Sequence, residues 1–178
     1  MIIGNGHFSW PYEPDFEGKN TFTGNQFHTH SFRRFDDEDF KGKNVLFVGS
    51  NFSATDLINH IFFDNTKDRI NPNKVFITSN DVSTIEKSQM YSKIISEGSL
   101  EVKSGNITKI DRGTVYFGDG TDEAIDTIIY ATGYYYSLPF IDPEDGIIEW
   151  DSYCDSKIKD SELEQKQRKG FYLGPLYK

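Results

Sequence analysis

The chain has 178 residues, of which 36% are hydrophobic and 15% aromatic, a composition that supports a packed core and argues against disorder. Its formal net charge of −9 argues against nucleic acid as a main partner, because binding to phosphates requires a basic surface. The single cysteine excludes a disulfide within the chain and suits a reducing, cytoplasmic environment. The chain contains no apolar run of about 20 residues, so no membrane segment is predicted.

The first forty residues carry turn formers rather than a periodic pattern, since glycine or proline stands at positions 4, 6, 11, 14, 18 and 24. We expect loops here, in a fold that the chain enters midway.

A strand, a glycine turn and a helix are predicted in direct succession. Residues 45–48 are continuously apolar, as in a parallel strand that is covered on both faces, and Gly49 ends that run. One buried helical stripe is predicted by the spacing of Ala54, Leu57, Ile58, Ile61 and Phe62. This succession is typical of a dinucleotide-binding unit, where helical N–H groups receive a pyrophosphate, although any βα unit of an α/β domain gives a similar pattern. Asn51 replaces the middle glycine of the fingerprint, and we expect it to adopt the left-handed backbone that asparagine tolerates.

Further elements follow in the order expected of an α/β fold. Strands are predicted at 75–78 and 127–130, and a hairpin at 107–117 that turns at Asp111-Arg112-Gly113. Ser83 and Glu86 form a capping box that predicts one helix extending to about Glu97. A further turn is expected at 119–120. From residue 142 the chain is polar, and 160–169 is either a solvated helix or a linker without assigned function.

Three motifs, in this order, resemble the flavin-containing monooxygenases, and most of all their bacterial, trimethylamine-oxidising members. The first is Phe-x-Gly, three residues, His28, three residues and an aromatic, over 22–32. The second is the turn at Gly49 with its Ser-Ala-x-Asp ending. The third is Ala-Thr-Gly-Tyr at 131–134. The resemblance covers roughly residues 1–142.

The resemblance implies an α/β fold, with a Rossmann-like three-layer dinucleotide-binding domain and flanking segments of a second, FAD-binding domain. It divides the chain into an FAD-domain segment and linker (1–40), an NAD(P)-binding domain (41–120), a return segment (121–150) and a polar linker or helix (151–178). The FAD-binding Gly-x-Gly-x-x-Gly turn that opens such enzymes has no counterpart here, so we interpret the chain as an internal fragment that does not hold FAD alone.

In such enzymes NADPH reduces FAD, and a flavin C4a-hydroperoxide transfers oxygen from O2 to an amine nitrogen or a sulfide sulfur. The resemblance therefore implies FAD and NADP as cofactors and a small amine or sulfide as the substrate. A homodimer is one assembly that the intact protein can form. The alternatives are a non-catalytic NAD(P)-binding module and another two-dinucleotide flavin oxidoreductase. A disulfide reductase lacks support, because the chain has no cysteine pair.

The same resemblance implies which residues contact cofactors, and it assigns no catalytic residue. The expected contacts are Gly49, Ser50, Asn51, Phe52, Ser53, Ala54, Ser79, Asn80, Ala131, Thr132 and Gly133. Phe52 takes the place beside the nicotinamide where relatives often have Asn or Tyr. Thr78, Ser79 and Asn80 can hydrogen-bond a 2′-phosphate, but no Arg follows the strand, Asp81 would repel the phosphate, and Lys74 lies at the wrong end. We therefore expect relaxed use of NAD beside NADP.

The histidines receive no catalytic role. His28 is expected to make a structural hydrogen bond at the domain junction. His30 lacks partners at metal-binding spacing, and His60 is expected on the surface of its helix. We therefore predict no metal site.

Overall fold

The computed structural model describes residues 8, 10–63, 70–79 and 82–135. It divides the chain into two units: one comprises Met1–Trp10 and Tyr134–Lys178, and the other Pro11–Gly133. In the first unit, the Trp10 and Tyr135 ring centroids lie 6.0 Å apart. The two-residue strands β1 (Trp10–Pro11) and β10 (Tyr134–Tyr135) pair with each other. All the features below belong to the second unit.

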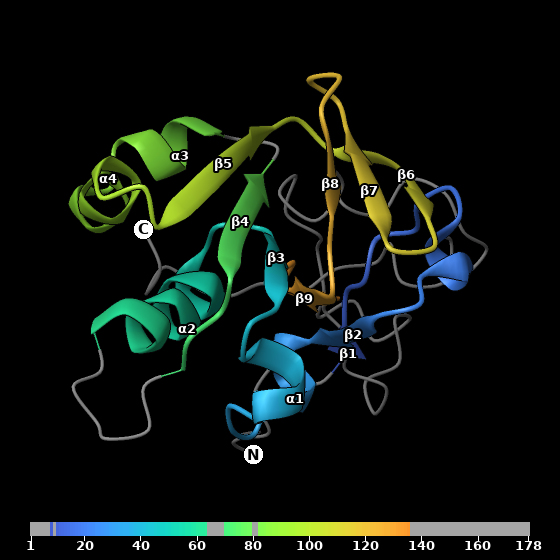
Figure 1. Cartoon of the computed structure of the whole chain (residues 1–178), viewed down its shortest axis with the longest axis horizontal. Coiled ribbons are helices and arrows are strands. Elements are labelled where there is room, and N and C mark those ends of the chain that lie inside the picture. The colour runs from blue at the N-terminus through green and yellow to red at the C-terminus, as the bar shows by residue number, and fades with distance from the viewer. Residues whose placement is uncertain (1–7, 9, 64–69, 80–81, 136–178) are drawn as a thin grey trace, which may run out of the picture. The chain divides into compact units, whose positions relative to one another are not determined.

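The second unit is built on a five-stranded parallel sheet (Figure 1). Its strand order is β2 (Asn25–His28), β9 (Thr127–Tyr130), β3 (Asn44–Val48), β4 (Lys74–Ser79) and β5 (Leu100–Ser104). The strands predicted at 45–48, 75–78 and 127–130 are confirmed and lie side by side in its middle. Strands β2 and β5 were not predicted, and they form the two edges.

Helices cover one face of this sheet. The helix α2 (Phe52–Phe63) buries Ala54, Leu57, Ile58 and Ile61, which confirms the predicted stripe except for Phe62, which is only partly buried. The single helix predicted at 83–97 is wrong. The structure has α3 (Val82–Glu86) and α4 (Gln89–Ser96), because the Ser88 side chain accepts a hydrogen bond from the Tyr91 N–H and starts a new helix. The capping box at Ser83 is wrong for the same region, since Ser83 lies inside α3.

The shorter elements flank the central sheet. They are the 3-10 turns η1 (Lys19–Thr21) and η2 (Thr29–Ser31) and the one-turn helix α1 (Asp37–Phe40). None of the helices in the described ranges has the length and apolar composition that a bilayer crossing requires.

An antiparallel sheet of β6 (Ile107–Asp111), β7 (Thr114–Phe117) and β8 (Asp122–Ala124) covers the other face. The predicted hairpin is confirmed, with Arg112 at φ 53° in its turn, and the turn at 119–120 is confirmed by Gly120 at φ 84°. Each face of the parallel sheet has its own hydrophobic core, and β3 contributes to both because successive side chains point to opposite faces. Val45 and Phe47 pack with the helices, and Leu46 and Val48 pack with the antiparallel sheet of β6, β7 and β8 (the hairpin sheet). The three-layer α/β architecture is therefore confirmed.

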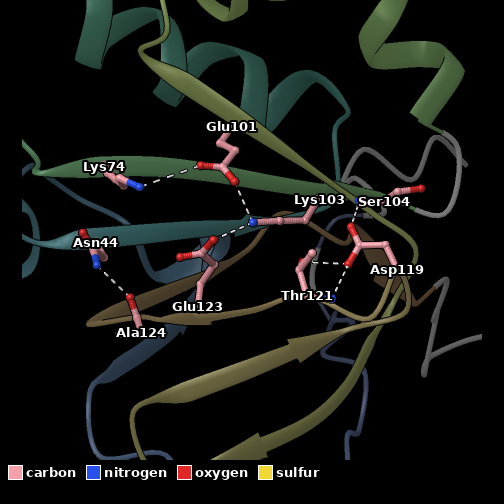
Figure 2. Close-up of polar contacts among 9 residues, drawn as sticks. All are labelled: Asn44, Lys74, Glu101, Lys103, Ser104, Asp119, Thr121, Glu123 and Ala124. Atoms are coloured by element: carbon pink, nitrogen blue, oxygen red, sulfur yellow. Dashed lines mark hydrogen bonds and ion pairs between the residues drawn. The ribbon is translucent and has the colours of Figure 1, made fainter.

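Lys103 of β5 is buried, and its ion pairs with two more exposed glutamates join the two sheets (Figure 2). Its Nζ lies 2.6 Å from Oε1 of Glu101 on the same strand and 2.6 Å from Oε1 of Glu123 on β8. Burial lowers the pKa of Lys103, but the hydrogen bonds to both glutamates outweigh burial and hold this pKa above its ordinary value. The same ammonium lies over the rings of Phe76 and Phe117. Asn44 Nδ2 extends this contact between sheets by donating to the Ala124 carbonyl at 2.8 Å.

These ion pairs give a first prediction, tested with a neighbouring lysine as control. Lys103→Met should lower the free energy of unfolding by about 2 kcal/mol, because two carboxylates lose the buried cation between them. Lys74→Met should cost under about 0.5 kcal/mol, since Lys74 is exposed and 4.0 Å from Glu101. Urea denaturation of both variants measures these costs, and equal costs would contradict the role given to Lys103.

The difference in stability between the wild-type protein and Lys103→Met should depend on pH. Because the pKa of Lys103 is raised in the folded state, its stabilisation is complete below the ordinary lysine pKa of about 10.4 and is lost as the pH rises through the folded-state value. The difference between the wild-type protein and Lys103→Met should therefore be constant from about pH 7 to 9 and shrink at higher pH.

Candidate functional site

The turn after β3 lies between two neighbouring strands. The Gly49 N–H donates to the Thr78 carbonyl of β4 at 2.8 Å, and the Ala131 N–H, just after β9, donates to the Val48 carbonyl at 2.8 Å. A Cβ added at Gly49 would lie 2.5 Å from the Ala131 carbonyl oxygen, and the backbone has φ 99°. Only glycine meets both conditions without strain.

The left-handed position of this turn differs from the one predicted. Arg112 is the one non-glycine residue with positive φ in the described part of the chain, so Asn51 does not use the left-handed backbone expected of it. Gly49 alone reverses the direction of the chain after β3, so Asn51 does not need a left-handed backbone. Asn51 directly precedes α2, where its carbonyl accepts the Thr55 N–H at 3.1 Å.

The residues from Ser50 to Ala54 divide into a buried part and an exposed part. Ser50 is buried, and its Oγ donates to Ser79 Oγ, at the end of β4, at 3.0 Å. Ala54 is fully buried against the sheet. Between them Asn51, Phe52 and Ser53 are exposed, with Phe52 88% accessible. The first turn of α2 thus faces outward at the carboxyl edge of the parallel sheet, where nucleotides bind in open α/β sheets.

The segment after β9 lies at the same edge, as expected from the parallel pairing of Val48 with Tyr130. Ala131 is buried. Thr132 Oγ1 donates to the Tyr12 carbonyl, and the Gly133 carbonyl accepts the Tyr12 N–H at 2.9 Å. Gly133 has φ 82°, which gives it a conformational reason to be glycine in addition to the closeness to cofactor that we predicted.

At the end of β4, Thr78 does not have the role that the sequence allowed for it. Thr78 is buried and donates its hydroxyl proton to the Gly105 carbonyl at 2.5 Å, so it is not available to donate to a phosphate. Ser79 lies at the carboxyl edge beside Ser50, and Lys74 lies at the opposite end of the strand, as predicted. Asn80 and Asp81 lie outside the described residues.

His28 makes a hydrogen bond within the backbone turn that follows β2. It is buried at the end of β2, and its Nδ1 accepts the His30 N–H at 3.0 Å. Burial lowers the pKa of His28, while a hydrogen bond with the Gly133 backbone opposes that shift. His30 and His60 are exposed, and His60 lies on α2 as expected. Within the described ranges, no group of three or more His, Cys, Asp or Glu residues is placed to hold a metal.

Two cavities of about 450 and 380 Å³ lie near the amino ends of the strands. The larger is lined in part by Asn25, Lys43 and Asp126, and the smaller by Lys74 and Ser99. Neither is lined by any residue predicted to contact a cofactor. The described residues among those predicted instead lie at the carboxyl ends of β3, β4 and β9 and at the start of α2.

A three-layer α/β domain with a strand–glycine–helix turn at the carboxyl edge of its parallel sheet has a fold of the Rossmann type. The family model described as pyridine nucleotide-disulphide oxidoreductase matches residues 1–174. Trimethylamine monooxygenase of Pelagibacter sp. (strain HTCC7211) is 30% identical over 174 residues, which are 98% of this chain and 35% of that protein.

Two solved structures have the same fold. The crystal structure of Tmm from Pelagibacter sp. strain HTCC7211 has a TM-score of 0.60 and 29% identity over 82% of this chain and 29% of that one. S-allyl-L-cysteine S-oxygenase from Allium sativum has a TM-score of 0.56 and 28% identity over 83% of this chain and 30% of that one. The chain thus belongs to the pyridine nucleotide-disulphide oxidoreductase family and, within it, to the flavin-containing monooxygenases. It spans only about a third of the curated relative, 35%.

The packing of Gly49 gives a second prediction. Gly49→Ala should lower the free energy of unfolding by more than about 3 kcal/mol, because its Cβ meets backbone that cannot move without disturbing β9. Gly42→Ala is the control, since Gly42 also has positive φ, 67°, but its Cβ would meet no atom within 4 Å. It should cost only the left-handed strain of about 1 kcal/mol. Urea titration measures both, and similar costs would show that the close approach to Ala131 is unimportant.

Proposed function

We propose that this chain supplies the NAD(P)-binding domain of an FAD- and NADPH-dependent monooxygenase that oxygenates a soft nucleophile, an amine nitrogen or a sulfide sulfur. The observation that carries the proposal is the Gly49 turn, which lies between β4 and β9 and opens into the exposed first turn of α2. The named relatives, a trimethylamine monooxygenase and an S-oxygenase, support the substrate class.

The residues at this edge suit a pyrophosphate. The first N–H groups of α2 have no partner within the helix, and the positive end of the helix dipole lies there. The exposed side chains beside them are small or neutral at Asn51 and Ser53, so none repels an anion. Asp56, one turn further on, stabilises the helix start through the dipole.

In the bound state NADPH supplies a hydride and FAD supplies the activation of O2, and the protein's part is to bind, orient and exclude water. Phe52 would give a bound nicotinamide an apolar face and no hydrogen bond. Thr132 and Gly133 would face the junction of the two cofactors, and Thr132 holds the backbone at Tyr12.

The residues at the end of β4 determine the preference between NADP and NAD. Ser79 is the one residue of the predicted trio 78–80 for which the structure describes a side chain at the edge, because Thr78 is engaged with Gly105. A serine hydroxyl contributes less to binding a phosphate than a bidentate arginine. We therefore propose that NADP and NAD bind with comparable affinity.

Thermal unfolding of the 178-residue chain with NADP⁺, NAD⁺, ADP or FAD tests the proposal. A ligand at a hundred times its dissociation constant stabilises the native state by about 2.7 kcal/mol, so the pyridine nucleotides should raise the midpoint by several degrees. FAD should raise it much less. If none of the nucleotides shifts the midpoint, the chain does not carry the binding domain, and if FAD alone does, the bound cofactor is the other one.

The exposed aromatic residue of the turn gives a separate prediction. Phe52→Ala should leave the unfolding midpoint nearly unchanged, because the ring is 88% exposed, but it should weaken NADP⁺ binding severalfold through the lost contact with the nicotinamide. ADP, which has no nicotinamide, should bind as before. Phe63→Ala, at the other end of the same helix, should alter neither affinity. Calorimetric titration measures all of them, and equal loss of ADP binding would place Phe52 elsewhere.

A further inference from the structure

A buried tyrosine lies directly behind the nucleotide-binding turn. Tyr91 of α4 is 2% exposed and belongs to the same buried cluster as Ala54 and Ala131. Its Oη lies 3.0 Å from Thr55 Oγ1 on α2, and it donates to the Ser50 carbonyl in the turn at 3.4 Å. One side chain thus reaches both the turn and the helix that the turn begins.

The direction of the hydrogen bond to Ser50 is fixed, because a carbonyl can only accept. Tyr91 donates to the Ser50 carbonyl, which has no proton to offer in return. Between Thr55 Oγ1 and Tyr91 Oη either hydroxyl can be the donor, and Thr55 Oγ1 also donates to the Asn51 carbonyl at 3.3 Å. The Tyr91 hydroxyl is protonated at physiological pH, because its ordinary pKa is about 10 and burial raises this pKa further.

Fixing the Ser50 carbonyl also fixes the next N–H group. A trans peptide is planar, and its C=O and N–H groups point in opposite directions. Because Tyr91 holds the Ser50 carbonyl, the Asn51 N–H points away from the Tyr91 hydroxyl, and the residue that carries it is exposed together with Phe52 and Ser53. The proposed function places the pyrophosphate at these exposed residues.

We infer that Tyr91 is a positioning residue for pyrophosphate binding: through the Ser50 carbonyl it sets the direction of the Asn51 N–H before the nucleotide arrives. The inference rests on the proposed function and deepens it, because it names a residue that touches no ligand and still sets affinity. Ser79, which bonds the Ser50 side chain from β4, holds the same residue from another direction.

The test compares two buried tyrosines. Tyr91→Phe removes the hydroxyl and keeps the ring. Tyr130→Phe is the matched control, because Tyr130 is also fully buried and also donates one hydrogen bond, to Gln26 Oε1 at 3.0 Å, on the opposite face of the sheet. Both variants should lose a similar, small amount of stability. Isothermal titration with NADP⁺ and with ADP, well below the unfolding transition, should show the dissociation constants rising about fivefold for Tyr91→Phe and less than twofold for Tyr130→Phe.

A second variant separates positioning from general loosening. Thr55→Val removes the hydrogen-bond partner of Tyr91 on α2 while keeping the shape of the side chain. The double variant Thr55→Val, Tyr91→Phe should bind no more weakly than Tyr91→Phe alone, because both changes act through the Tyr91 hydroxyl. If the losses of affinity add up in the double variant, Thr55 and Tyr91 act independently, and this result contradicts a common action through the Tyr91 hydroxyl.

The possible results are distinct. Unchanged affinity of Tyr91→Phe for both ligands, while the wild-type chain binds them, overturns the inference and leaves the proposed function standing. A loss confined to NADP⁺ also overturns it, because ADP carries the pyrophosphate. A wild-type chain that binds neither ligand overturns the proposed function, and the inference with it.

Discussion

The site depends above all on three parallel strands that end at the same level. The pairing of Val48 with Thr78 on one side and with Tyr130 on the other places the residues after β3, β4 and β9 next to one another. A shift of one residue in either pairing would reverse which side chains face the helices and which face the hairpin sheet. Both hydrophobic cores oppose such a shift, because β3 sends alternate apolar side chains into each of them. The position of the Gly49 turn is therefore a consequence of packing on both faces of the sheet.

Packing on both faces of the sheet explains which elements could be predicted from the sequence. The central strands were predictable because residues that are buried on both faces form continuous apolar runs, as at 45–48. The stripe of α2 was predictable for a related reason, since burial of one face fixes the helical spacing. Gly49 could be identified because a turn between a buried strand and a buried helix leaves little room for a side chain.

The features that were missed involve polar residues whose partners are distant in sequence. Strand β5 contains Glu101 and Lys103, a pattern typical of an exposed segment, yet Lys103 is buried because Glu123 of β8 neutralises it. The break between α3 and α4 depends on Ser88, which looks like any polar residue until its hydrogen bond to the Tyr91 N–H is seen. Thr78 was considered able to hydrogen-bond a phosphate, since nothing nearby in the sequence indicates its partner, the Gly105 carbonyl, 27 residues away. No sequence signal points to the contact of Tyr91 with Ser50.

The alternation of β4 decides which residues can serve the site at all. Phe76 and Thr78 face the hairpin sheet, where Phe76 packs in its core and Thr78 bonds Gly105. Val75 and Ile77 face the helices. Ser79 continues that second series and meets Ser50 at the start of α2. Because side chains alternate, only every other residue of β4 can reach the Gly49 turn. A change at Thr78 would therefore act on the contact between the sheets, whereas a change at Ser79 would act on the nucleotide-binding turn, although the two residues are adjacent.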